Sequence, residues 1–531
     1  MFFSIERLYT FFIELRGFKR GSLAIFLGLI SVAAFPPIHF VPIVIISFVG
    51  LIWLLDGSKK KKNFNRQQSA EDCFINGSFL VGYNFGLGFF SAGFYWIGFS
   101  FLVDAEKFSW MMPFAILGLS ACFATYIGLV TFITFYLSNR GIGRIIIFSI
   151  VWVVFEWIRG FLFTGFPWNL LGTIWVNSNN MIQFASFFGV LGLSLMTALT
   201  LSSFAIMGYK NKPIIWRLKA VGAPVSLMVL AWIGGVYKLS GVDTDFVDGV
   251  LLRLVQPNIQ QSEKWKPEKR LNHLNNLLEL TNSPSVQGDT MKPTHIIWPE
   301  TAIPFSLRGS LSPALEIISK AAPKNGALFS GALEITNNQF GEKKFWNTLK
   351  VITPENKNFD SYKKFHLVPF GEFIPFREQL ETLLIDNKYS ALARIDFSRG
   401  SGLKVLNAPG IPPASPLICY EIIFTGNVVP ANVDEQNRPE WLLNITNDAW
   451  FGLSMGPYQH LAAAKFRAVE EGLPLVRVAN TGISALIDPY GRTIVQTRLN
   501  ERNFIDVGLP KAITERTFFS KAQALFYRFL H

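Results

Sequence analysis

The sequence predicts two structural classes in one chain: a bundle of membrane-spanning α-helices followed by an α/β domain. Half of the 531 residues are hydrophobic and 15% are aromatic, which is too apolar for a single soluble domain. Near residue 240, long uncharged stretches give way to short β-rich runs that alternate with helix-compatible segments. We therefore expect a transmembrane helical domain over 1–240, an α/β domain large enough to be catalytic over 248–508 and a C-terminal tail over 509–531.

The first domain contains seven candidate membrane spans, each near the roughly 20 residues that cross a bilayer as a helix. They run approximately over 22–36, 40–55, 75–101, 111–137, 145–163, 182–208 and 220–237.

Positive charge is concentrated in alternate segments between these spans. The basic segments contain Arg16, Lys19 and Arg20, then Lys59, Lys60, Lys61, Lys62 and Arg66, then Arg140 and Arg144, and finally Lys210, Lys212, Arg217 and Lys219. The other loops, such as "FPPIH" and "TGFPWNLLGTIWVNSNN", are nearly free of lysine and arginine. Because basic loops stay in the cytoplasm, seven spans deliver the second domain to the opposite face, the periplasm of a bacterium. The net charge of +12 therefore indicates a multi-pass inner-membrane topology and not a nucleic-acid partner.

The tail "TERTFFSKAQALFYRFLH" is apolar but short, and Lys521 and Arg528 interrupt it. It is typical of an interfacial or partial membrane helix, with an eighth transmembrane helix as the alternative.

Cys419, in "PLICYEIIF", is the only cysteine of the second domain, because Cys73 and Cys122 fall at or within membrane segments. An unpaired cysteine in a disulfide-permissive compartment is either a buried structural residue or a reactive thiol. Two residue types that assist thiol chemistry follow apolar runs of the same domain. Glu300 in "HIIWPETAIPF" could accept the thiol proton, and Lys364 in "YKKFHLVPFGEFIPF" could stabilise an oxyanion. Taken singly, each is equally typical of a solvated surface charge.

Taken together, these segments carry a resemblance. "WPETAIPF", "YKKFHLVPFGE" and "ICYEIIF", in this order, resemble the Glu, Lys and Cys blocks of the nitrilase (carbon–nitrogen hydrolase) superfamily. "NITNDAWFG" at 444–452 and "ANTGISALIDPYGR" at 479–492 resemble later blocks of the same fold. The resemblance implies an αββα sandwich over roughly 250–508.

The preceding spans narrow this resemblance to the apolipoprotein N-acyltransferase family. "VQPNIQQSEKW" at 255–265, "TGFPWNLLG" at 164–172 and "GFYWIGFSF" at 93–101 are similar to segments of that family. The tail departs from the family pattern, which usually closes with an eighth transmembrane helix.

The resemblance implies an acyl transfer in two steps, with Glu300 as base, Lys364 at the oxyanion and Cys419 as nucleophile. It further implies that Glu372 and Glu421 support these three residues, and that Trp265 and Tyr420 lie near the lipid-facing mouth. The alternatives are structural ion pairs for the two glutamates and buried core positions for the two aromatic residues. No metal or other cofactor is expected.

The implied acyl donor is a glycerophospholipid, with phosphatidylethanolamine expected, and the implied acceptor is a diacylglyceryl-modified apolipoprotein. We expect a monomer in the lipid bilayer. A membrane-tethered amidase acting on small periplasmic amides is the alternative enzyme. A transporter with a regulatory domain is disfavoured, because few ionisable residues lie in the spans and no repeat is apparent.

Overall fold

The computed structural model describes residues 5–58, 77–285, 292–305, 313–337, 341–355, 359–375, 377, 396–431 and 433–530. These residues form two compact units. Unit 1 comprises Met1–Gly241 together with Ser454–Ala462, and unit 2 comprises Val242–Leu453 together with Ala463–His531.

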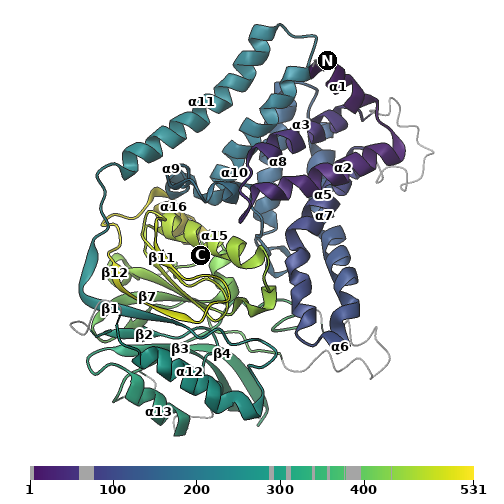
Figure 1. Ribbon diagram of the computed structural model, residues 1–531. Helices are drawn as coiled ribbons and strands as arrows, with labels where there is room; N and C mark the ends of the chain where they lie inside the picture. Colours follow the sequence, from purple (N-terminus) through teal and green to yellow (C-terminus); the bar gives the residue numbers. More distant parts are fainter. Residues whose placement is uncertain are drawn as a thin grey trace. The chain divides into compact units, whose positions relative to one another are not determined.

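Unit 1 is built from apolar helices (Figure 1). Its described α-helices are α1 (Ile5–Glu14), α2 (Gly17–Ser31), α3 (Pro42–Asp56), α5 (Gly77–Phe94), α6 (Ala105–Phe108), α7 (Met112–Leu137), α8 (Ile142–Ile158), α9 (Asn179–Ile182), α10 (Ala185–Ser203) and α11 (Ile214–Leu239). A 3₁₀ segment, Tyr95–Leu102, continues α5.

Five described helical segments are long and apolar enough to cross a membrane: Gly17–Ala34, Gly77–Leu102, Ala105–Leu137, Ala185–Gly208 and Ile214–Leu239. The two other expected spans, 40–55 and 145–163, coincide with α3 and α8, which have 15 and 17 residues. The structure therefore supports a multi-spanning helical unit, while the count of seven spans stays a prediction. The expected basic loop at Lys59–Lys62 and Arg66 lies outside the described residues, as does Cys73.

Glycines allow the helices of unit 1 to pack backbone against backbone. A Cβ atom at Gly28 of α2 would lie 1.9 Å from the carbonyl oxygen of Phe85 in α5, and one at Gly82 of α5 would lie 2.3 Å from that of Ile127 in α7. Such small-residue contacts are the usual way in which membrane helices associate. Lipid is as apolar as the side chains, so there is no hydrophobic gain from burying them, and close packing of the backbones stabilises the contact instead.

One residue that the sequence places in a basic loop lies elsewhere. Arg144 is inside α8, is only 2% exposed and forms an ion pair with Asp56 at the end of α3. The Tyr209 hydroxyl also donates to Asp56, at 2.9 Å. The Arg144 charge is thus paired within the protein, in the first turn of α8 and not in the loop before it.

Unit 2 contains two six-stranded sheets. The first has the order β12 (Asn503–Pro510), β1 (Phe246–Gln256), β2 (His295–Ile297), β3 (Ala327–Asn337), β4 (Lys343–Ile352) and β5 (Asp360–Lys363). The second has the order β11 (Thr493–Gln496), β10 (Ala485–Ile487), β9 (Leu475–Ala479), β8 (Trp441–Thr446), β7 (Ile411–Ile418) and β6 (Leu406–Ala408). In each sheet three adjacent strands are parallel, β1–β2–β3 and β7–β8–β9, and the outer strands are antiparallel.

The inward faces of the two sheets share one hydrophobic core, which includes Leu252, Phe329, Leu349, Trp441 and Val478. The helices α12 (Arg270–Asn282) and α13 (Pro313–Ala321) cover the outer face of the first sheet (Figure 1) and enclose a second core around Trp298. The helices α15 (Gly456–Glu471) and α16 (Phe518–Leu530) follow in the chain. Unit 2 is therefore the two-sheet α/β sandwich that the sequence predicts.

The tail forms α16, whose 13 residues span only about 20 Å as a helix. Its start is tied to the end of α15, since the Thr517 hydroxyl donates to the carbonyl oxygen of Glu470 and the Ser520 hydroxyl donates to Glu471 at 2.8 Å. A hydrocarbon core of about 30 Å exceeds this length.

Candidate active site

Cys419 occupies a sharp turn at the carboxyl end of β7. Its φ of +54° lies in the left-handed region, which is uncommon for a residue with a side chain, and a 3₁₀ turn, Cys419–Ile423, follows immediately. The sulfur-bearing residue is only 8% exposed. An unfavourable backbone conformation held by well-packed surroundings is common at functional sites.

Glu300 lies at the equivalent place in the first sheet, just after β2. The loop at Glu300 is pressed against β3, where a Cβ atom on Gly331 would lie 2.6 Å from the Glu300 Cα and 2.3 Å from the Thr301 nitrogen. Only glycine permits this approach. Thr301 itself has a φ of +45°, so the chain turns sharply and leaves the Glu300 carboxylate inside the unit, with the residue 7% exposed.

Lys364 and Asn347 join Glu300 to a second carboxylate, Glu372. The Lys364 Nζ lies 2.9 Å from Glu372 Oε1 and 3.7 Å from Glu300 Oε1. The Asn347 Nδ2 donates to the same two oxygens, at 3.1 and 2.7 Å respectively. Glu372 is held in turn by the Val368 backbone N–H, which donates to its other oxygen at 2.8 Å. We refer to Glu300, Lys364 and Glu372 as the carboxylate–lysine cluster.

Glu421, two residues after Cys419, binds mainly to the main chain. Its carboxylate accepts hydrogen bonds from the Tyr362 hydroxyl at 2.6 Å and from the backbone N–H groups of Phe365, His366 and Ile418 at 2.8, 3.0 and 2.7 Å. This single side chain therefore links the segment that carries Lys364 to the strand end that carries Cys419.

The electrostatics of the cluster favour a neutral thiol beside a charged lysine. Burial raises the pKa of Cys419, the Glu300 carboxylate raises it further, and the Lys364 ammonium opposes both. Burial alone would lower the pKa of Lys364, but the carboxylates of Glu372 and Glu300 outweigh it and raise that pKa. The thiol is therefore protonated at rest, and its reaction as a nucleophile requires a base within the site.

Comparison with known proteins identifies both units. The family model of the apolipoprotein N-acyltransferase N-terminal domain matches residues 27–203, and the carbon–nitrogen hydrolase model matches residues 251–516. Curated apolipoprotein N-acyltransferases are similar over nearly the whole chain. The protein from Bradyrhizobium diazoefficiens is 38% identical over 94% of this chain and 90% of its own, and that from Rhodopseudomonas palustris is 35% identical over 96% and 93%. The chain belongs to the apolipoprotein N-acyltransferase family.

Solved structures similar to this member of the apolipoprotein N-acyltransferase family come from the nitrilase superfamily. An amidase from Nesterenkonia covers 54% of this chain and 99% of its own, with a TM-score of 0.36 and 14% identity. A Saccharomyces cerevisiae member of the superfamily covers 53% and 93%, also with a TM-score of 0.36 and 14% identity.

The structure gathers most of the residues that the sequence singles out. Glu300, Lys364 and Glu372 are in contact, and the charges of Glu300 and Lys364 both act on Cys419. Tyr420 is buried against Phe424, with ring centroids 5.2 Å apart.

Trp265 differs from the other predicted site residues. It is 39% exposed, which excludes the buried core position considered as an alternative from the sequence. No described contact joins its side chain to the carboxylate–lysine cluster, so a place at a lipid-facing mouth stays a prediction.

Two polar residues of the site escape sequence reasoning. Asn347 lies in β4 within "FWNTLKV", where an amide among apolar strand positions was the available signal. Lys264 precedes Trp265 in a charged stretch and reads as a surface lysine, yet it is only 4% exposed. Among the described residues no group of three or more His, Cys, Asp or Glu side chains could hold a metal ion.

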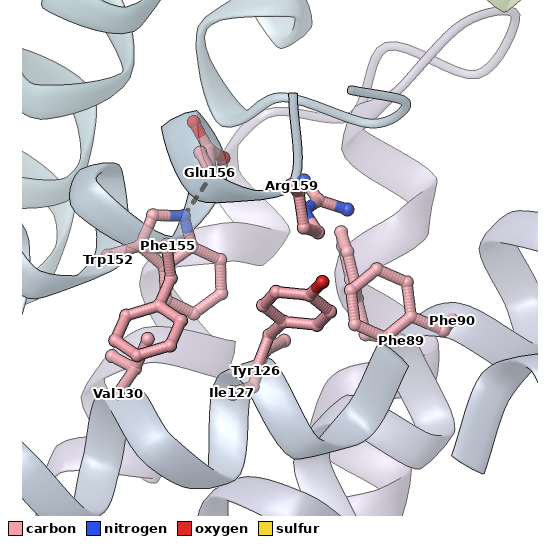
Figure 2. A pocket seen from close by; sticks show the side chains of 9 residues that line it. All are labelled: Phe89, Phe90, Tyr126, Ile127, Val130, Trp152, Phe155, Glu156 and Arg159. Atoms are coloured by element: carbon pink, nitrogen blue, oxygen red, sulfur yellow. Dashed lines mark hydrogen bonds between the residues drawn. The ribbon is translucent and has the colours of Figure 1, made fainter. Parts of the chain in front are cut away.

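Unit 1 of this apolipoprotein N-acyltransferase family member holds a separate small pocket between α5, α7 and α8 (Figure 2). It is lined by Phe89, Phe90, Tyr126, Ile127, Val130, Trp152, Phe155, Glu156 and Arg159. Glu156 accepts hydrogen bonds from the Trp152 indole at 3.0 Å and from the Leu171 backbone at 2.7 Å, while the Arg159 guanidinium lies over the Phe90 ring. The Glu156 and Arg159 charges, three residues apart, act on each other through space.

Proposed function

We propose that this protein transfers a fatty acyl chain from a glycerophospholipid, through a thioester on Cys419, to the α-amino group of the diacylglyceryl-modified N-terminal cysteine of an apolipoprotein. The observation that carries the proposal is the convergence of Glu300, Lys364 and Cys419 in a chain whose relatives are named apolipoprotein N-acyltransferases. The alternative, an amidase acting on small amides, would use the same three groups but offers no reason for a multi-spanning helical unit.

In the first step Glu300 takes the proton of the Cys419 thiol, and the sulfur attacks the ester carbonyl of the phospholipid. The carbonyl oxygen becomes negatively charged, and the Lys364 ammonium stabilises it. The carbon–oxygen bond to the glycerol then breaks, and Glu300 returns its proton to the departing alkoxide. Lysophospholipid leaves, and the acyl chain remains on sulfur as a thioester.

In the second step the free α-amine of the apolipoprotein attacks the thioester carbonyl. Glu300 takes a proton from the attacking nitrogen, the carbon–sulfur bond breaks, and the proton passes to the Cys419 sulfur. An amide forms and the resting thiol is restored. Cysteine suits this two-step reaction because its sulfur is a strong nucleophile in the first step and a good leaving group in the second.

Phosphatidylethanolamine is the proposed donor. We further propose that unit 2 faces the periplasm of the inner membrane and that the protein acts as a monomer. The apolar helices of unit 1 support the membrane location, since five described segments are long enough to span a bilayer.

Mass spectrometry of the intact enzyme after exposure to labelled phosphatidylethanolamine tests the proposal. We expect one acyl chain on the wild-type protein, removable by hydroxylamine, and none on Cys419→Ser. Cys122→Ser is the matched control, because Cys122, like Cys419, forms no disulfide but lies exposed on α7 of unit 1. It should acylate at the wild-type rate.

Two outcomes would count against the proposal. Full transfer activity in Cys419→Ser would remove Cys419 as the nucleophile. Release of ammonia from a small aliphatic amide, with no acyl chain detected on the enzyme, would favour the amidase alternative.

A further inference from the structure

A second lysine, Lys264, lies against the loop that carries Glu300. It is 4% exposed, and its Nζ donates a hydrogen bond to the main-chain carbonyl oxygen of Glu300 at 3.1 Å. Lysine is rarely buried to this extent unless a specific partner compensates its charge. The location of this ammonium therefore calls for a functional or structural explanation.

The turn that carries Lys264 is held in place by two asparagines of the second sheet. Asn480 accepts from the Ile259 backbone N–H at 2.9 Å and donates to the Ile259 carbonyl oxygen at 2.7 Å. Asn447 donates to the Gln261 side chain at 2.7 Å and accepts from Asn480 at 2.9 Å. These bonds hold the turn at Ile259 and Gln261, and the His273 ring contacts the Glu263 carbonyl oxygen at 3.1 Å, so the residues that lead into Lys264 have defined partners.

The hydrogen bond to Glu300 uses only part of what Lys264 can donate. An ammonium carries three N–H donors, and the Glu300 carbonyl is the one acceptor recorded for it among the described residues. The charged or titratable groups that act on it through space are the Glu300 carboxylate and the Cys419 thiol. Lys264 therefore faces the reacting groups and not solvent.

The count of charges explains what a second lysine contributes. Glu300 and Glu372 carry two negative charges, and they share the single positive charge of Lys364. The other buried carboxylates nearby have their own partners: Glu421 has four donors, and Asp448 has Arg477 at 2.8 Å. Without Lys264 the carboxylate–lysine cluster has an excess negative charge in a buried site.

We propose that Lys264 is a positioning residue of the acyl-transfer site: it fixes the main chain of Glu300 and supplies the second positive charge of the carboxylate–lysine cluster. The inference rests on the proposed function. When the thiol proton moves to Glu300, negative charge moves from the carboxylate to the sulfur and then to the carbonyl oxygen, and its sum is unchanged. With both lysines the charges of the carboxylate–lysine cluster are balanced throughout. With Lys364 alone, every anionic state would form beside an uncompensated buried charge.

The rate at which iodoacetamide alkylates Cys419 at pH 7 tests this role without any lipid. The measurement uses the full-length protein with Cys73→Ser and Cys122→Ser, so that Cys419 is the remaining thiol. We expect Lys264→Met to react about tenfold more slowly, the change that corresponds to one pKa unit of thiolate stability. Lys264→Arg, which keeps the charge, should remain within about threefold of the parent. Lys266→Met, an exposed lysine two residues away, should equal the parent.

Lys264→Gln separates the charge from the hydrogen bond, because the amide still donates to the Glu300 carbonyl but carries no charge. Slow alkylation in Lys264→Gln supports the electrostatic role, and it also keeps the test valid if Lys264→Met fails to fold. Parent-like alkylation in a folded Lys264→Gln or Lys264→Met protein would overturn the inference.

Acyl-enzyme formation from labelled phosphatidylethanolamine, measured on the same variants, distinguishes this inference from the proposed function. The expected result is the same order of rates as in alkylation. If the parent never acylates while the alkylation rates still follow the charge at position 264, the proposed function fails and the placement of Lys264 stands.

Discussion

At the scale of residues, the site is organised by donors that two carboxylates share. Lys364 and Asn347 each contact one oxygen of Glu300 and one oxygen of Glu372. If either carboxylate moved, its contacts with Lys364 and with Asn347 would both break. Such a network rigidifies a buried polar site only when its members are satisfied. The arrangement holds the Glu300 carboxylate in place, and the two carboxylates raise the pKa of Lys364 and so keep that lysine charged.

The pH dependence of acylation should show the loss of the positive charge of Lys264 at high pH. Burial lowers its pKa to about 8, so the ammonium is charged below that pH and neutral above it. We therefore expect acyl-enzyme formation by the wild-type protein to decline as the pH rises through about 8, because the compensating charge is lost. A guanidinium stays charged in this range, so Lys264→Arg should keep its rate to higher pH.

The measurement is the rate of acyl-enzyme formation from labelled phospholipid, with samples quenched at set times between pH 6 and 10. Lys266→Met serves as the control and should follow the wild-type profile. If the acylation rate declined at the same high pH in the wild type and in Lys264→Arg, a group other than Lys264 would be responsible for the decline.

Glu300 and Cys419 both lie just after strands, as expected where a polar side chain follows an apolar run, while their roles stay predictions. The residue-level predictions missed Asn347 and Lys264 because a single polar residue within a strand or a charged turn looks the same from the sequence whether it faces solvent or a site. Only the tertiary contacts of β4 and of the turn at 261–265 distinguish these cases.

At the scale of elements, the parallel strands bring the site together. Glu300 follows β2 and Cys419 follows β7, which are the middle and first of three parallel strands in their respective sheets. Ligands and catalytic groups commonly collect at the carboxyl ends of such strands. The β-rich runs beyond residue 240 include "ALFSGALEI", which lies within β3, and "EWLLNITND", which contains β8, while the helix-compatible segments 268–281 and 458–471 overlap α12 and α15.

Short strands at the sheet edges were not foreseen. β5, β6 and β11 have only three or four residues each, and neighbouring strands decide their pairing. Local sequence patterns carry little information on such elements, because tertiary context outweighs intrinsic β propensity there.

Gly331 of β3 provides a test of how an element controls the site. Gly331→Ala would place a methyl group 2.6 Å from the Glu300 Cα, and a backbone atom cannot yield as a flexible side chain can. We expect the Glu300 loop to shift, with a loss of stability of about 1–3 kcal/mol, typical of overpacking. Acyl-enzyme formation should fall by an order of magnitude or more, because a displaced base loses its alignment.

Thermal unfolding in detergent and the acylation rate check the two effects. Wild-type rates together with an unchanged melting temperature would mean that the loop tolerates the methyl group and that this contact does not position Glu300.

At the scale of the whole molecule, the chain combines a membrane-spanning helical unit with a two-sheet unit. The sequence predicts both units, because near residue 240 long uncharged stretches give way to short β-rich runs that alternate with helix-compatible segments. The number of spans is harder to predict. Asp56, Arg144, Glu156 and Arg159 lie at or within short helices and are buried by protein contacts, so composition alone does not separate a spanning helix from a core helix.

The fate of the tail is testable at this scale. Because the start of α16 is tied to the end of α15, we expect residue 531 to lie on the same side of the membrane as the start of unit 2. Alkaline phosphatase fused after residue 241 and after residue 531 should therefore give matching activity, with green fluorescent protein fusions as the complementary reporter. Opposite results from the two fusion sites would establish an eighth span.

The burial of Cys419 has a further consequence for the durability of the enzyme. A thiolate reacts with oxidants and attacks disulfides far faster than a thiol does, and Cys419 is both protonated at rest and only 8% exposed. In the proposed mechanism the sulfur becomes anionic only during proton transfer to Glu300, so it is shielded between turnovers. This would allow the thiol to survive oxidising conditions without a reductant to repair it.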